Sequence, residues 1–138
     1  MFVDACAIVS LMAGENTAPA YGAALARAGC AFTSPMAAWE AIIVLSRPDQ
    51  DCAYSEAEAA VIEWLEARGI GLSEAPSPRE LLAHAVDVAQ KQGIGRHALR
   101  NFDCFHYSYA KACGVPLLTL DRLLRQTVLF RRDPLVPE

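Results

Sequence analysis

The chain has 138 residues, a formal net charge of -4 and 54% hydrophobic residues, with a mean hydropathy of +0.20. A chain of this length forms one domain that buries about two-thirds of its unfolded surface, and the composition excludes a disordered protein. No apolar run approaches the roughly 20 residues of a membrane helix, and the start shows neither the basic nor the apolar region of a signal peptide. The five cysteines form no C-x-x-C pair, which indicates reduced thiols, so we expect a cytoplasmic protein without membrane association.

Strand patterns alternate with helical patterns along the chain. In chain order we predict a strand at 2–3, a helix at 7–12, a helix at 15–28, a strand at 31–33, a helix at 35–47, a helix at 55–68, a strand at 70–74, a helix at 78–92, a helix at 101–113, a strand at 115–120, a helix at 122–126 and a strand at 128–130. This alternation is typical of βαβ units. The predicted fold class is therefore α/β, with a central, mostly parallel sheet and helices on both faces.

Local signals set several of these boundaries. A serine followed by proline is a good helix start, and it occurs at Ser34 and at Ser77. Ser55 together with Glu58 matches a capping box and is predicted to open the helix at 55–68. Glycines that directly follow helical patterns, such as Gly114, mark helix ends.

Four acidic residues lie in apolar surroundings, where a carboxylate is costly unless it is paired, hydrogen-bonded or bound to a metal. They are Asp4, Glu40, Asp103 and Asp121. Two directly follow predicted strands and two fall in the early turns of predicted helices, so we expect all four at one edge of the sheet. Oxygen ligands of this kind suit Mg²⁺ or Mn²⁺ better than zinc or copper, and such sites often catalyse phosphoryl transfer or phosphodiester hydrolysis.

Three of the four acids also have a structural explanation. Asp4 and Asp121 suit helix N-caps, and Asp103 suits the N-terminal end of a helix or an ion pair with Arg100. Glu40 has no basic residue within reach along its own helix. We favour one site shared by all four acids over a separate structural role for each of them.

The remaining polar residues give weaker signals. The three histidines lack the spacing of a metal motif, and His106, which lies among aromatic residues, is expected to be packed or hydrogen-bonded. No nucleotide-binding or serine-hydrolase motif is present. The segment 91–132 carries eight basic residues against two acids, both of them candidate ligands, as expected where a metal site meets a polyanion. Within this segment, Arg96, His97 and Arg100 are candidates for contacts with phosphate groups.

Four segments, in the same order along the chain, resemble those of PIN-domain ribonucleases, especially the VapC-type toxins. Residues 2–9 (FVDACAIV) resemble the opening (F/V)-(I/V)-D-(A/T)-S-(A/V), and residues 33–41 (TSPMAAWEA) resemble the segment that carries an acid on the third helix. Residues 96–105 (RHALRNFDCF) resemble (H-P-A-x)-L-N-F-G-D-C, and residues 116–121 (PLLTLD) resemble the strand end P-L-L-T-x-D. Together these segments span nearly the whole chain.

The resemblance implies a single PIN-like domain over residues 1–138 and an endoribonuclease that hydrolyses structured RNA such as tRNA or rRNA. It implies that Asp4, Glu40, Asp103 and Asp121 bind Mg²⁺ or Mn²⁺ and form the catalytic site. It also implies a homodimer that a cognate antitoxin protein neutralises. Our hypothesis for the reaction is attack by a metal-bound hydroxide in line with the scissile phosphorus.

The sequence departs from the family pattern at three places. Cys6 replaces the Ser or Thr expected two residues after the first acid. Asn101 stands two residues before Asp103, where the family has three. The last site reads TLDRL over residues 119–123, where many toxins have K-G-(D/N)-D-F. We expect Cys6, Asn101 and Thr119 to support the acidic residues.

Two other functions remain open at this point. One is a degenerate PIN-like module that binds RNA or a partner protein without cleaving, as the departures at Cys6 and before Asp103 would allow. The other is a phospho-acceptor receiver domain, which would need an acidic pair at the first strand and a late lysine that the sequence lacks.

Surplus apolar residues on two early helices suggest a groove for a partner's helix or strand, with core packing as the alternative for most of them. These residues are Ile8, Val9, Leu11, Met12, Ile42, Ile43, Val44 and Leu45.

Overall fold

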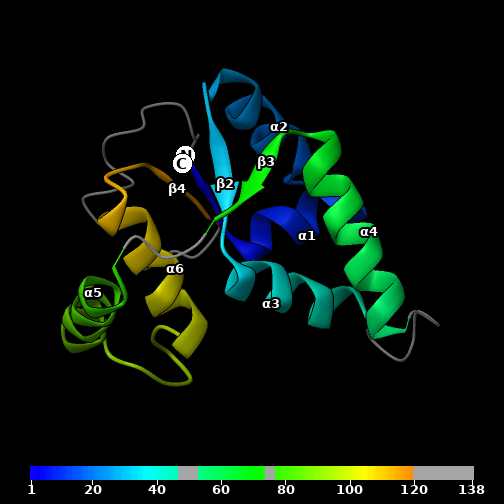
Figure 1. The fold of residues 1–138 in the computed structure, drawn as a ribbon. Coiled ribbons are helices and arrows are strands. Elements are labelled where there is room, and N and C mark those ends of the chain that lie inside the picture. Colours follow the sequence, from blue (N-terminus) through cyan, green and yellow to red (C-terminus); the bar gives the residue numbers. More distant parts are fainter. Residues whose placement is uncertain (47–52, 74–76, 120–138) are drawn as a thin grey trace.

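The structure is a computed structural model and describes residues 1–46, 53–73 and 77–119. Its elements are β1 (Phe2–Val3), α1 (Ala5–Ala13), α2 (Ala18–Arg27), β2 (Ala31–Thr33), α3 (Pro35–Leu45), α4 (Tyr54–Ala67), β3 (Ile70–Leu72), α5 (Pro78–Gln92), α6 (Asn101–Ala112) and β4 (Leu117–Leu118) (Figure 1). The helix predicted at 122–126, the strand predicted at 128–130 and Asp121 lie outside the described residues.

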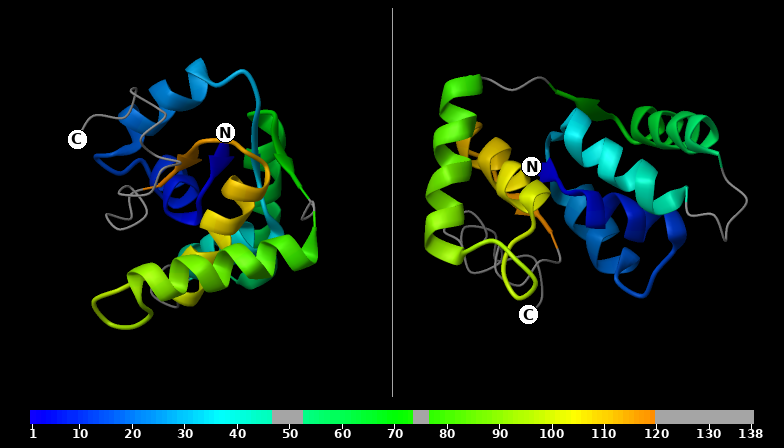
Figure 2. Two further views of the ribbon diagram at one scale, coloured as in Figure 1. Left: turned by 90° about the vertical axis from the view of Figure 1, so that its left-hand side faces the viewer. Right: turned by 90° about the horizontal axis from the view of Figure 1, so that it is seen from below.

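The strands form a four-stranded, all-parallel sheet in the order β3-β2-β1-β4. Helices α5 and α6 pack together on one side of the sheet, and α1 and α4 lie on the other (Figures 1 and 2). Helix α3 contacts both α1 and α6. This arrangement confirms the predicted α/β class, with a parallel sheet between two layers of helices.

The serine–proline signals correctly placed two helix starts. The hydroxyl of Ser34 accepts a hydrogen bond from the backbone N–H of Ala37 at the start of α3, and that of Ser77 accepts one from Glu80 at the start of α5. The sequence Ala31–Thr33 forms the strand predicted for it, and Gly114, with φ of +64°, follows the end of α6. Local chemistry is sufficient at these positions because the partners lie within one helical turn.

The predicted capping box at Ser55 and Glu58 is wrong. Helix α4 begins at Tyr54, and the carbonyl of Ala53 already accepts the N–H of Ala57, so Ser55 lies inside the first turn and not before it. The start of α2 also differs from the prediction. Glu15 donates its N–H to the carbonyl of Ser10 in the turn that ends α1, and α2 begins only at Ala18.

The core lies between the sheet and the two helix layers. Phe2 and Val3 of β1 are fully buried, as expected for a central parallel strand covered on both faces. Ile8 of α1 and Leu65 of α4 pack into the same cluster. Within the described residues, no helix combines the length and apolar character needed to cross a membrane.

Candidate metal centre

Three neighbouring strands of the sheet end at the same level, and a polar residue follows each of them. Phe2 pairs with Phe32, and Val3 pairs with Leu118. Asp4, Ser34 and Thr119 are the next residues along β1, β2 and β4, and all three are buried. Parallel strands place these polar groups at the carboxyl edge of the sheet, where sites of open α/β folds gather.

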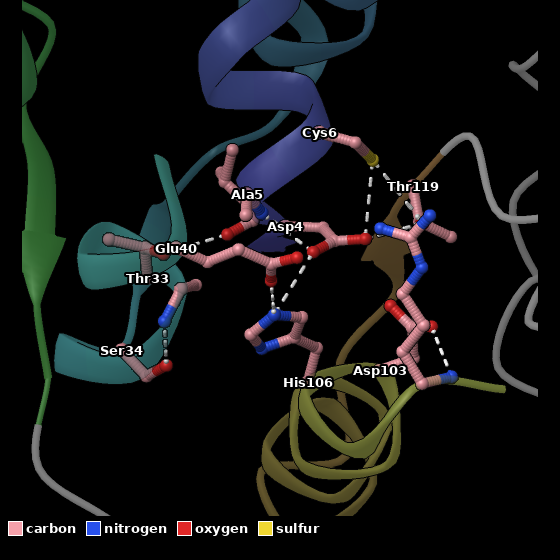
Figure 3. Close-up of polar contacts among 12 residues, drawn as sticks. Asp4, Ala5, Cys6, Thr33, Ser34, Glu40, Asp103, His106 and Thr119 are labelled. Carbon is pink, nitrogen blue, oxygen red and sulfur yellow. Dashed lines mark hydrogen bonds and ion pairs between the residues drawn. The ribbon is translucent and has the colours of Figure 1, made fainter. Parts of the chain in front are cut away.

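Asp4 is held by hydrogen bonds to both of its carboxylate oxygens (Figure 3). Oδ1 accepts the backbone N–H of Ala5 at 2.6 Å, which makes Asp4 the N-cap of α1. Oδ2 accepts the hydroxyl of Thr119 at 2.5 Å and the thiol of Cys6 at 3.3 Å. Cys6 therefore donates to Asp4 with its thiol, at the position where the family pattern has a hydroxyl. Asp4 is only 3% exposed, so these donors replace water around the carboxylate.

Glu40 and His106 complete a compact group with Asp4. Glu40 projects from α3 and His106 from α6, and Oε2 of Glu40 lies 2.7 Å from Nε2 of His106. The same nitrogen lies 3.5 Å from Oδ1 of Asp4. One ligand atom from each of the three residues lies within 4.8 Å of the other two (Figure 3). Two carboxylates and an imidazole are a donor set that fits a divalent metal ion.

His106 is fully buried and contacts two aromatic rings. Its imidazole stacks on Phe2 at a centroid distance of 6.1 Å and on Phe102 at 6.5 Å. Burial alone would lower the pKa of His106, but the carboxylates of Asp4 and Glu40 outweigh it and hold this pKa above its ordinary value. The two acids therefore favour the protonated, positively charged form of the imidazole.

Asp103 lies on the same helix as His106, one turn nearer the helix start. Its Oδ2 accepts the backbone N–H of Arg100 at 2.8 Å, so it caps the first turn of α6. Asp103 is half-buried and its charge also acts on His106, but it is not one of the three residues whose ligand atoms converge. The structure thus brings Asp103 to this end of the sheet with a defined role as a helix cap.

The other predicted residues differ in their burial and in whether they contact this group. Thr119 touches Asp4, whereas Asn101 is exposed at the start of α6. Arg96 and His97 are exposed in the segment between α5 and α6. Arg100 is also exposed, and it lines a depression of about 200 Å³ together with Glu40 and Cys6.

His106 was the residue that sequence reasoning undervalued. The expectation that it would be packed or hydrogen-bonded is correct, but its hydrogen-bond partner is a candidate ligand. The available signal was its position three residues after Asp103 in a predicted helix, because residues at this spacing lie on the same helix face. If the helix directs Asp103 toward the site, it therefore directs His106 toward the site as well.

Comparison with protein-family models matches residues 1–128 to the PIN domain. The matched range includes all four acidic residues named above. Comparison with curated proteins gave no significant match.

Proposed function

The chain belongs to the PIN-domain family, and on this premise we propose that it is a metal-dependent endoribonuclease acting on structured RNA such as tRNA or rRNA. One observation carries the proposal: Asp4 and Glu40, 36 positions apart in the sequence, converge at the carboxyl edge of the sheet within one possible metal-binding group. Carboxylates gathered in this way, with Asp4 buried and Glu40 half-buried, are costly unless a cation compensates them.

We assign the metal site to the acidic residues of this edge. Asp4 and Glu40 would bind Mg²⁺ or Mn²⁺, and we propose Asp103 and Asp121 as further ligands. The bound ion would supply a Lewis acid and lower the pKa of a bound water. Thr119 and Cys6 contribute by fixing the position of the Asp4 carboxylate, since each donates a hydrogen bond to Oδ2.

Arg100 is the basic residue best placed to hold the RNA backbone. It lines the depression that also contains Glu40, so a phosphate bound there would lie beside the proposed metal site. Arg96 and His97 are exposed and precede Arg100 closely in the sequence, and they would extend this contact along the RNA strand. Such contacts position RNA without reading its sequence, and we therefore attribute selectivity to RNA shape.

We further propose the toxin role, with a cognate antitoxin and a homodimeric assembly. A depression of about 380 Å³ between α3 and α4 exposes the side chains of Trp39 (48%) and Tyr54 (62%), whose ring centroids are 6.4 Å apart. An apolar segment of an antitoxin would bury these rings. Of the apolar residues singled out in the sequence, Ile8 and Ile42 belong to the core, while Ile43 is exposed.

The nuclease proposal is tested with purified protein and total cellular RNA in Mg²⁺, in Mn²⁺ and in EDTA, with mapping of the RNA ends. We expect cuts that depend on metal and that Asp4→Asn abolishes. Asp87→Asn is the matched control, because Asp87 is an acid on α5 that bonds Lys91 and lies outside the three-residue group. Cleavage by Asp4→Asn at the rate of the unmodified protein would refute the proposal.

A degenerate module that binds RNA or a partner protein without cleaving is the second candidate. The observation in its favour is the 2.7 Å contact between His106 and Glu40, because a protonated imidazole can compensate a carboxylate without any metal. Calorimetric titration with Mn²⁺ separates the two candidates. A degenerate site shows no binding, whereas a nuclease binds the ion and cuts RNA.

A further inference from the structure

The nitrogen at the centre of the acidic group changes the kind of ion that the group can hold. Carboxylate oxygens suit Mg²⁺ and Mn²⁺ alike, whereas an imidazole nitrogen favours transition ions over Mg²⁺. The sequence predicted an all-oxygen site. In the structure, Nε2 of His106 is the atom that lies between the oxygens of Asp4 and Glu40.

The separations between these atoms match those of neighbouring ligands on one ion. With metal–ligand bonds of about 2.1 Å, adjacent ligands of an octahedral ion lie about 3 Å apart. Nε2 of His106 is 2.7 Å from Oε2 of Glu40 and 3.5 Å from Oδ1 of Asp4, values on either side of that spacing. An ion placed among the three atoms therefore requires only small movements of the side chains.

The orientation of the ring also directs Nε2 toward the site. His106 is fully buried, and its other nitrogen, Nδ1, has no hydrogen-bond partner among the described residues. Within the described residues, the polar contacts of the ring are therefore made through Nε2. Here the stacking on Phe2 and Phe102 fixes the ring plane, and the polar partners of the ring in the described part of the chain are carboxylates of the site.

We propose that His106 is a direct ligand of the bound ion through Nε2, together with Asp4 and Glu40, and that the site consequently selects Mn²⁺ or a later transition ion over Mg²⁺. This inference rests on the proposed metal-dependent function. Binding requires the proton on Nε2 to leave to solvent, as for any histidine ligand. Glu40 then exchanges its hydrogen bond with His106 for a bond to the shared ion.

The decisive measurement is pulsed electron paramagnetic resonance of Mn²⁺ bound to the unmodified protein. A directly bound imidazole gives ¹⁴N modulation, which changes when the histidines are labelled with ¹⁵N. We expect this signal in the unmodified protein and in His84→Phe, and its loss in His106→Phe. His84 is the matched control, because it contacts Glu80 on α5 and not the site.

Affinities provide a second and independent test. His106→Phe keeps an aromatic ring against Phe2 and Phe102, and we expect it to weaken Mn²⁺ binding by about tenfold or more while changing Mg²⁺ binding by less than about threefold. His106→Gln keeps an N–H donor for Glu40 but no imidazole, so it should also lose the nitrogen signal. Should either variant fail to fold, the nitrogen signal of the unmodified protein still decides.

The outcomes separate this inference from the proposed nuclease. Mn²⁺ binding without nitrogen modulation, or an unchanged Mn²⁺-to-Mg²⁺ affinity ratio in folded His106→Phe, overturns the ligand role even where RNA is cut. Nitrogen modulation without RNA cleavage upholds the ligand role and refutes the nuclease. Absence of any Mn²⁺ binding overturns the ligand role and points to the degenerate module.

Discussion

Replacing Thr119 with valine tests how Asp4 is held in the site. The Thr119 hydroxyl donates to Oδ2 of Asp4 at 2.5 Å, across 115 positions of sequence. Valine has nearly the same shape as threonine but lacks the hydroxyl, so the change removes one donor and leaves the packing. Thr119 is fully buried and Asp4 is 3% exposed, so water cannot take the place of the lost donor.

The expected cost follows from the chemistry of this bond. Hydrogen bonds between a hydroxyl and a carboxylate are short, at about 2.5–2.7 Å, and the observed distance lies in that range. A hydrogen bond to a charged group contributes about 1.5–3 kcal/mol, so we expect Thr119→Val to lower the free energy of unfolding by about 2 kcal/mol. Thr119→Ser keeps the hydroxyl and removes one methyl group, at a cost of about 1 kcal/mol.

Urea unfolding in EDTA, followed by circular dichroism, measures these values. A double-mutant cycle with Asp4→Ala isolates the term for the pair, because it subtracts the effects of each change alone. We expect a coupling energy near 2 kcal/mol for Thr119→Val with Asp4→Ala. A coupling energy below about 0.5 kcal/mol would refute the view that Thr119 fixes the Asp4 carboxylate.

Three further predictions test the fold. Gly114→Ala should lower the free energy of unfolding by about 1 kcal/mol, because φ of Gly114 is +64°, in the left-handed region. Gly29→Ala is the control: φ of Gly29 lies outside that region, so the change should be neutral within about 0.5 kcal/mol. Equal effects of the two substitutions would contradict this reasoning. Ser34→Ala removes the N-cap of α3 and should cost about 1 kcal/mol by the same measurement; no loss would contradict a contribution from the cap. At pH 8, a thiol reagent should label exposed Cys30 faster than Cys104, because burial raises the pKa of the Cys104 thiol and lowers its thiolate fraction; equal rates would show that Cys104 is accessible.

Local sequence signals determined most of the fold. The helix starts at Ser34 and Ser77 depend on a side chain and a backbone N–H three positions apart, and such contacts form in the same way whatever surrounds them. The same reasoning failed at Ser55, because the helix begins one residue before it and a serine inside the first turn cannot cap. Strand existence was predictable from apolar runs, since a parallel strand buried on both faces needs apolar residues at nearly every position.

Some features of the candidate site could likewise be predicted from local sequence. Asp4 could be singled out because it directly follows an apolar strand, and its burial agrees with that context. Asp103 was placed correctly in the first turn of a helix, where its carboxylate caps the backbone. Neither observation required knowledge of the sheet order, because each depends only on the residues next to it.

The sequence by itself determined the α/β alternation, the family resemblance and the acids at the ends of its strands and helices. Only the tertiary structure decided that His106 lies between Asp4 and Glu40, and that Thr119 and Cys6 share one oxygen of Asp4. The contact between His106 and Glu40 joins residues 66 positions apart. This contact depends on the strand order and on the packing of α3 against α6. The hydrophobic periodicity of the sequence cannot predict it, because periodicity specifies which face of a helix or strand is buried and not which other element covers that face.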